Sequence, residues 1–350
     1  STLLSQPADQ SSNTTTHDEV SMLGSLLEID PSAPKDQECP LNGGMFTFVE
    51  REAWEKRRPL FVMIENSPDA RPQSGMGRAD VVFEAVAEGG VTRFAAVYYC
   101  DAQRDEVIIA PVRSARTYFV DWASGFNLPM YVHVGGANLP GPTDALGQIR
   151  QYGWSLQNDL DQFSIGFPTF VRNNNRLGRA VATEHTVETT TEKLWEVAEK
   201  RGWTSTDPKG NDWLDGYTSW VFEDQPSAKG SVSKVSYDFW SGYGQYSVSW
   251  DYDDQQSRFL RTMGGEKHID HNDGERIAVA NVIVLKTSEK GPINELKHML
   301  YETVGKGKAL VFKNGDAFEV NWSKPTRQSQ ITFTTNQGAP FELARGPIWI

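Results

Sequence analysis

Between residues 58 and 203, short apolar segments alternate along the chain with segments of helical periodicity. The apolar segments are rich in β-branched residues and are bounded by Pro, Gly or Asp, which predicts buried strands in RPLFVMIEN, ADVVFEAVA, RFAAVYYC, EVIIAPV and MYVHVGG. Helices are predicted at 116–122, 143–152 and 189–201. Because strands alternate with helices, we expect an α/β domain with a mixed sheet and flanking helices at residues 38–203.

The second half of the chain has a different pattern. After residue 230, apolar and polar residues alternate with period two in SVSKVSYDF, GQYSVSWDYD, SRFLRTM, RIAVANVIVL, KALVFKNGDAFEVNW and QITFTT, and Asn314-Gly315 is a hairpin-turn dipeptide. We therefore expect a smaller, β-rich C-terminal domain at residues 231–350. Residues 204–230 are polar and rich in turn residues, which is typical of a linker or a long packed loop.

Residues 1–37 are rich in Ser, Thr, Gln, Asp and Pro, and they carry too little apolar surface to offset the entropy lost on ordering. We interpret them as a tether that is disordered or partly docked, in which residues 20–29 could form a short helix. The chain opens with Ser1 rather than Met, which suggests that a leader was removed. A tether behind a removed leader is typical of a lipid-anchored or secreted protein.

The charge balance and the cysteines narrow the partners and the compartment. A formal net charge of −12 over 350 residues opposes attraction to nucleic acid. No apolar run reaches the ~18 residues that a spanning helix needs, so we expect membrane attachment by a lipid anchor only. Cys39 and Cys100 could pair in an oxidising compartment, but their spacing leaves open whether they do.

A loop rich in functional groups follows the first predicted strand. It contains Asn66 and Arg71, and loops at strand ends are where α/β proteins place their sites. The alternative is a turn fixed by its prolines, in which both side chains bond neighbouring main chain.

Three acids spaced four residues apart, Asp80, Glu84 and Glu88, lie in the next segment. On a helix they would share one face and could hold a divalent cation such as Mg²⁺ through oxygen ligands. The alternative is a solvated acidic face without a metal.

Arg113 and Arg116 stand where the helix predicted at 116–122 begins. Two guanidinium groups beside free helical N–H groups would form an anion site. Buried ion pairs with the nearby acids are the alternative. Further along, Arg176 and Arg179 belong to a basic loop, which in an acidic protein favours an anionic ligand.

Two histidines are candidates for a general base near neutral pH. His133 lies inside a predicted strand, where a histidine is more often a hydrogen-bonded core residue, and His185 follows Glu184. No Ser or Cys nucleophile motif accompanies either histidine. The sequence also has no phosphate-loop lysine, dinucleotide fingerprint or HExxH motif, so nucleotide hydrolysis and zinc proteolysis rank low.

Several segments together resemble the YerB-like lipoproteins, a bacterial family of unknown function. The motifs RPQSG, EGGxTRF and PVRSAR occur in that order, followed by YVHVGG and ATEHTVETTTEKL. The resemblance runs from about residue 40 to residue 350 and implies a processed lipoprotein or secreted protein at the cell surface, with an α/β domain followed by a smaller one. The chain departs from the family at Thr183-Glu184-His185, where Ala-Pro-His-Asn is usual, but it keeps the histidine.

A more distant likeness is to the LytR-CpsA-Psr phosphotransferases, which join lipid-linked glycans to the cell wall. This likeness implies that Asp80 holds Mg²⁺ and that a polyprenyl pyrophosphate is held by Arg113, Arg176 and Arg179. Ser114 stands where that family has Asp after the arginine, which puts the metal site and catalysis in doubt.

We therefore expect an extracytoplasmic cell-envelope protein whose N-terminal domain binds an anionic, phosphorylated or glycan-derived ligand. The candidate ligand-binding residues are Asn66, Arg71, Arg93, Arg113, Arg116, His133, Arg176, Arg179 and His185. Two alternatives remain open. One is a Mg²⁺-dependent phosphotransferase acting on a lipid-linked glycan, with metal ligands among Asp80, Glu84 and Glu88. The other is an envelope scaffold that binds no small ligand and in which the arginines are structural.

Overall fold

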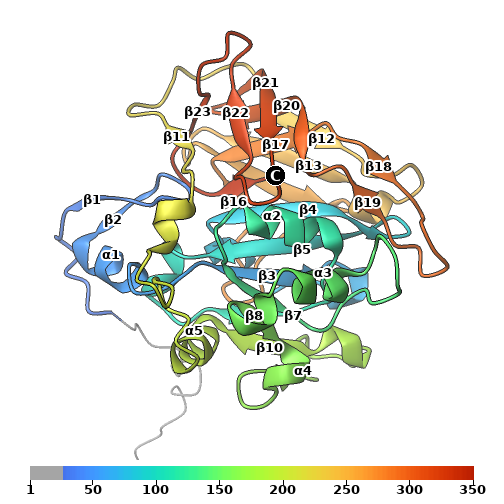
Figure 1. The fold of residues 1–350 in the computed structure, drawn as a ribbon. Coiled ribbons are helices and arrows are strands. Elements are labelled where there is room, and N and C mark those ends of the chain that lie inside the picture. Colours follow the sequence, from blue (N-terminus) through green and yellow to red (C-terminus); the bar gives the residue numbers. More distant parts are fainter. Residues whose placement is uncertain (1–26) are drawn as a thin grey trace, which may run out of the picture.

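A ten-stranded mixed sheet runs through the computed structural model, which describes residues 27–350 (Figure 1). In spatial order its strands are β22 (Thr332–Thr334), β21 (Asp316–Lys324), β20 (Gly305–Lys313), β17 (Asn281–Leu285), β24 (Ile348–Trp349), β4 (Val81–Glu88), β5 (Val91–Tyr98), β3 (Leu60–Glu65), β7 (Met130–His133) and β8 (Asp159–Asp161). β5 is antiparallel to β3 and β4, whereas β24 is parallel to β4 and β17.

Three helices cover one face of this sheet: α1 (Phe48–Trp54), α2 (Thr117–Ser124) and α3 (Ala145–Gln151). Tyr118 and Trp122 of α2 and Ile149 of α3 pack in one buried cluster with Phe61 and Phe83 of the sheet. α2 and α3 also contact each other and lie side by side in Figure 1. The helices predicted at 116–122 and 143–152 are therefore confirmed within two residues at each end.

The opposite face is covered by a second sheet and by α5 (Thr191–Lys200), which confirms the third predicted helix. The second sheet contains β12 (Lys234–Tyr237), β13 (Val248–Asp253), β14 (Arg258–Met263), β15 (Glu266–Lys267) and β16 (Ala278–Val279). Trp250 and Phe259 from this sheet and Trp195 from α5 are buried with Ile64 and Phe94 of the central sheet.

The remaining elements are short. They are α4 (Gln162–Ile165) and the strands β1 (Lys35–Glu38), β2 (Met45–Thr47), β6 (Ile108–Ile109), β9 (Val171–Arg172), β10 (Val187–Thr190), β11 (Val221–Phe222), β18 (Glu289–Lys290), β19 (Leu300–Tyr301) and β23 (Glu342–Leu343). The predicted turn at Asn314-Gly315 is confirmed, since both residues have positive φ, 49° and 66°, between β20 and β21. Across residues 27–350, no helix is long and apolar enough to cross a bilayer.

The two halves of the chain share the central sheet. β24 comes from the end of the chain but lies between β4 of the first half and β17 of the second, where Figure 1 marks the C-terminus. An α/β first half with a mixed sheet and a β-rich second half are thus observed as expected, joined by common strands. Residues 204–230 follow the packed-loop alternative, because Trp213, Tyr217 and Trp220 are buried in the core. Most of the predicted tether, residues 1–26, and most of the helix predicted at 20–29 lie outside the described residues.

Candidate functional site

Three parallel strands of the central sheet end at the same edge. β3, β4 and β7 run in the same direction, and their last residues are Glu65, Glu88 and His133. Ligands of open α/β sheets bind outside the carboxyl ends of the strands. This edge is therefore where the predicted ligand-binding residues would form a site.

Six side chains at this edge form what we call the edge cluster. They are Glu65, Glu88, Arg93, Arg113, Arg116 and His185. The cluster is continuous, because Arg93 on β5 lies directly opposite Glu65 on β3 in the strand register. Three arginines face two carboxylates, so the cluster carries one net positive charge when the histidine is neutral.

Glu88 holds two of the three arginines. Arg93 and Arg116 each donate to one of its carboxylate oxygens at 2.9 Å, and each also donates to a main-chain carbonyl, of Ser114 and Ala115 respectively. Burial opposes ionisation of Glu88, but the two guanidinium groups outweigh it and lower its pKa to about 2. Both terminal nitrogens of Arg93 and of Arg116 are therefore engaged within the protein, whereas the buried Nε of each arginine has no hydrogen-bond partner within residues 27–350.

Glu65 orients the other two members of the cluster. His185 Nδ1 lies 2.8 Å from one Glu65 oxygen, and Arg113 Nε lies 3.5 Å from the other. Within residues 27–350, no group accepts a hydrogen bond from the terminal nitrogens of Arg113, and none bonds Nε2 of His185. Arg113 is also the most exposed of the three arginines, at 26% of its side chain. As far as residues 27–350 show, its guanidinium group is the one in the edge cluster whose terminal nitrogens are open to a ligand.

The start of α2 lies directly after Arg113. Arg116 is the cap residue of α2, and no side chain of the described chain caps the helix there. The first N–H groups of a helix carry partial positive charge and bind anions when no side chain satisfies them. Arg113 precedes this helix start by a few residues in the chain, and Arg116 at the cap is paired with Glu88.

The loop after β3 is tied to its surroundings by the other predicted arginines. Arg71 donates to the side-chain and main-chain oxygens of Asn66 and to the carbonyl of Gln245. Arg176 donates to the carbonyls of Ala70 and Pro72, and Arg179 to that of Asp69. Arg71 matches the alternative of a turn whose side chains bond main chain, whereas the Asn66 side chain bonds other side chains, since Nδ2 donates to Thr92 and Oδ1 accepts from Arg71 and Gln73. Arg71, Arg176 and Arg179 position the loop and do not join Arg113.

His133 is also engaged on both sides. Its ring nitrogens lie 2.7 Å from the Gly135 carbonyl and 2.7 Å from the Asp159 carboxylate. Both partners are acceptors, so the ring donates twice when it is protonated. Burial alone would lower the pKa of His133, but the carboxylates of Asp159 and Asp161 raise it overall. His133 is therefore a structural histidine, and it has no free nitrogen for the ligand role predicted for it.

The structure does not bring Asp80, Glu84 and Glu88 together. They lie on and next to a strand, β4, and not on a helix. A bulge between Val86 and Glu88 turns Glu88 to the helix-covered face, whereas Glu84 points to the second sheet. Eight residues of strand span about 26 Å, so Asp80 lies far from the edge cluster. The predicted Mg²⁺ site on these three acids is not formed.

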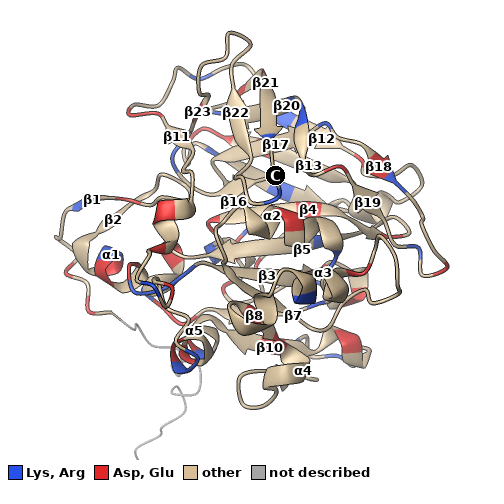
Figure 2. Ribbon diagram, viewed as in Figure 1, with Lys and Arg blue, Asp and Glu red and all other residues tan. Residues whose placement is uncertain are grey.

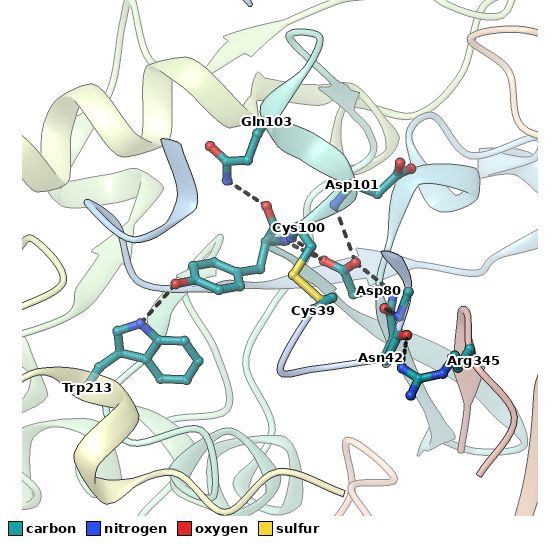
Figure 3. The surroundings of a disulfide bond; sticks show 11 residues. Cys39, Asn42, Asp80, Cys100, Asp101, Gln103, Trp213 and Arg345 are labelled. Atoms are coloured by element: carbon teal, nitrogen blue, oxygen red, sulfur yellow. Dashed lines mark hydrogen bonds between the residues drawn. A yellow bond between two sulfur atoms is a disulfide. The ribbon is translucent and has the colours of Figure 1, made fainter. Parts of the chain in front are cut away.

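Asp80 belongs instead to the surroundings of a disulfide (Figure 3). Cys39 and Cys100 are bonded, with Cα atoms 5.9 Å apart. Asp80 accepts hydrogen bonds from Asn42 Nδ2 at 2.8 Å and from the main-chain N–H groups of Tyr99, Cys100 and Asp101. Burial, with a smaller contribution from the charge of Asp101, raises the pKa of Asp80 to about 7, although the three main-chain N–H donors act to lower it. Its role here is to anchor the end of β5 to the start of β4.

Glu84 belongs to a buried polar network that the sequence analysis did not predict. It accepts from Arg261 Nη2 at 2.6 Å, Trp349 Nε1 at 3.0 Å and Thr92 Oγ1 at 2.9 Å. Arg261 also donates to His268 Nδ1, so His268 is neutral and donates from Nε2 to Gln73. The network joins the central sheet to the second sheet. Its signal in the sequence is an arginine at an inward position of the alternating segment SRFLRTM, between Phe259 and Met263.

Charges elsewhere are mixed. Figure 2 shows Lys and Arg positions interspersed with Asp and Glu positions over the described elements. In that view, no broad region of the ribbon is basic, so the excess of arginine at the edge cluster is local.

Comparisons with known proteins agree with this architecture. Residues 47–204 match the N-terminal domain, and residues 235–350 the C-terminal domain, of a protein family of unknown function described as DUF3048. The chain is 29% identical over 300 residues to "Putative lipoprotein YerB" of Bacillus subtilis, covering 84% of this chain and 80% of that protein. The crystal structure of YerB from Bacillus subtilis superposes with a TM-score of 0.72 at 25% identity, over 90% of this chain and 95% of that one. The chain therefore belongs to the DUF3048 family, whose function is not known.

Proposed function

We propose that this protein is an extracytoplasmic cell-envelope protein that binds an anionic ligand at the edge cluster. The observation that carries the proposal is the Arg113 guanidinium group, whose terminal nitrogens have no acceptor within residues 27–350 and which precedes the uncapped start of α2. A planar guanidinium fork suits phosphate and carboxylate oxygens. The ligand would be phosphorylated or glycan-derived.

The rest of the cluster supports binding indirectly. Arg93 and Arg116 are nearly buried and leave Glu88 fully ionised, so the region behind Arg113 carries two positive charges against one negative. His185, held by Glu65, offers Nε2 as a further donor when protonated or as an acceptor when neutral. An anion at Arg113 would therefore meet an attractive local field within an acidic protein.

Two observations support the proposed location. A relative of the chain is named as a lipoprotein. The Cys39–Cys100 disulfide is the kind of bond that forms in oxidising compartments outside the cytoplasm. Attachment through a lipid anchor, or secretion, follows from the proposal.

The phosphotransferase alternative needs a metal beside the arginines. The carboxylate it assigns to Mg²⁺, Asp80, is completely buried, lies at the far end of β4 and is satisfied by four protein donors. Arg176, assigned to the pyrophosphate, is likewise occupied by the carbonyls of Ala70 and Pro72. We therefore favour binding without metal-dependent transfer.

The proposal is tested by thermal unfolding of the whole chain with inorganic phosphate, pyrophosphate, polyprenyl phosphate and wall glycan fragments, each with and without Mg²⁺. A ligand at a hundred times its dissociation constant stabilises the protein by ~2.7 kcal/mol. Arg113→Gln should remove that shift while changing the ligand-free stability by less than ~0.5 kcal/mol, because the Arg113 side chain makes one loose ion pair, with Glu65, among the described residues.

Arg51→Gln is the matched control, since Arg51 is an exposed arginine in an ion pair on α1. It should keep the ligand-induced shift. A shift that survives Arg113→Gln, or no shift with any anion, would contradict the proposal and favour the scaffold alternative.

A further inference from the structure

Glu65 fixes the position of the proton on the neutral His185 ring. Nδ1 of His185 lies 2.8 Å from Oε2 of Glu65, and an ionised carboxylate only accepts hydrogen bonds. Nδ1 therefore carries the proton, and Nε2 is left with a lone pair. Within residues 27–350, no group bonds Nε2. The neutral ring therefore offers a ligand a hydrogen-bond acceptor and not a donor.

The open guanidinium group of Arg113 lies beside this acceptor. Nε of Arg113 is 3.5 Å from Oε1 of Glu65, the carboxylate whose other oxygen holds His185. Nε of Arg113 is buried, but its terminal nitrogens and Nε2 of His185 are not among the buried, unpartnered atoms of the described chain, so they reach the surface. One carboxylate therefore holds a fork of donors and a lone pair next to each other, and both are open to the same ligand.

The charge around this pair favours a ligand with a single negative charge. The edge cluster carries one net positive charge when its histidine is neutral. A main-chain hydrogen bond lowers the pKa of Glu184, and the charges of His185 and Arg113 lower it further, so another carboxylate lies near the pair. A phosphate monoester carries about −1.5 to −2 charges at pH 7 and would be repelled more strongly by the nearby carboxylates. A carboxylate carries one charge, and its planar shape also fits a guanidinium fork.

A carboxylate alone would leave the lone pair of His185 without a donor. Displacing water from an acceptor without replacing its hydrogen bond costs free energy, so the best ligand also supplies a donor at this point. A hydroxyl group on a carbon next to the carboxylate would donate to Nε2 of His185 while the carboxylate accepts from Arg113. Sugar acids combine these two groups, because their carboxylate is bonded to a chain or ring of carbons that carry hydroxyl groups.

We propose that the ligand of the edge cluster is a hydroxy acid of the sugar-acid class, whose carboxylate accepts from Arg113 and whose neighbouring hydroxyl group donates to Nε2 of His185. This inference rests on the function proposed above, because it names the ligand class of the same anion site. It narrows a phosphorylated or glycan-derived ligand to the carboxylate-bearing components of glycans.

The test compares three small anions by thermal-shift titration of the whole chain at constant sodium concentration. The titrations are made at pH 8.5, well above the ordinary histidine pKa of about 6.5. Glycerate and propionate have the same charge and the same number of carbon atoms, but only glycerate has hydroxyl groups. Glycerate should bind about tenfold more tightly, since a factor of ten is ~1.4 kcal/mol and one hydrogen bond contributes about that much. Glycerol 3-phosphate, which has the hydroxyl groups but a more highly charged anion, should bind less tightly than glycerate.

Substitution of His185 separates the hydroxyl contact from the carboxylate contact. His185→Asn keeps an N–H donor for Glu65 near the place of Nδ1 and removes the acceptor at Nε2. It should weaken glycerate about tenfold, to the affinity of propionate, and leave the binding of propionate unchanged. His271→Asn is the matched control, because it makes the same change at an exposed histidine and should alter neither affinity. Arg113→Gln should weaken both ligands.

Equal binding of glycerate and propionate, or tighter binding of glycerol 3-phosphate than of glycerate, would overturn this inference and leave the proposed anion site intact. A preference for glycerate that survives His185→Asn would also overturn it. No binding of any of the three anions would instead contradict the function proposed above, and this inference with it. If circular dichroism shows that His185→Asn does not fold, the comparison of the three anions on the unaltered protein decides alone.

Discussion

The ion pair between Glu84 and Arg261 should contribute more to stability than any exposed pair of the same length. Its side chains are 1% and 0% exposed and its charged atoms are 2.6 Å apart. Arg261→Met would leave Glu84 buried with Thr92 and Trp349 as its remaining donors among residues 27–350. An unpaired buried charge costs about 3–5 kcal/mol. The guanidinium group also lies 4.4 Å from the Trp349 ring, an interaction that methionine only partly replaces. We therefore expect a loss of about 3–5 kcal/mol.

The assay is urea unfolding of the oxidised chain, followed by tryptophan fluorescence and by circular dichroism to check that both probes report one transition. Lys229→Met is the control, because Lys229 pairs with Asp254 at 2.5 Å but both side chains are more than half exposed. It should cost less than about 1 kcal/mol. Adding Glu84→Gln to Arg261→Met should recover part of the loss, since both charges are then absent. Equal costs for Arg261→Met and Lys229→Met would refute the reasoning from burial.

Three further predictions concern pH and the disulfide. The pKa of His133 is raised in the folded state, so its stabilising contribution is complete below the ordinary histidine pKa of about 6.5 and is lost as pH rises through the raised value. His133→Gln should therefore lower the free energy of unfolding most in acid. A difference in that free energy that does not change with pH would contradict this. Burial and the neighbouring Arg261 hold the pKa of His268 well below its ordinary value, so the stabilisation that the neutral ring provides is present above about pH 6.5 and is lost as pH falls. His268→Gln should therefore make the free energy of unfolding fall less steeply as the pH is lowered. An unchanged fall at low pH would count against this reasoning. The Cys39–Cys100 bond spans a sequence separation of 61 residues, so replacing both cysteines by serine should lower the free energy of unfolding in urea by about 4 kcal/mol. A reducing agent should lower the melting temperature of the unaltered chain but not that of the double variant.

Local chemistry explains why several elements could be predicted from sequence. The helix predicted at 189–201 appears as Thr191–Lys200 with Thr190 as its cap, because the capping hydroxyl and the apolar spacing act within a few residues. The Asn314-Gly315 turn appears for the same reason, since both residues tolerate positive φ.

The candidate site shows where local reasoning stops. The sequence predicts Arg113 and Arg116 at the start of a helix and His185 as a candidate base, but which of these three side chains is free depends on partners distant in sequence. Glu88 occupies Arg116, whereas Glu65 orients His185 and leaves the terminal nitrogens of Arg113 open. The four-residue spacing of the acids would place them on one face only if the segment were a helix, but the segment forms the strand predicted for ADVVFEAVA, buried on both sides, which separates the acids.

The sequence by itself determined the order of elements, the change from alternating strands and helices to period-two strands, and the residue types gathered at the strand ends, because these depend on neighbours in the chain. Only the tertiary structure decided that the last strand, β24, lies between the two halves, that Cys39 meets Cys100, and that Arg261 meets Glu84. Those contacts join residues separated by tens to hundreds of positions. Their selection depends on which faces can be buried together, and periodicity within one segment carries no information about that choice.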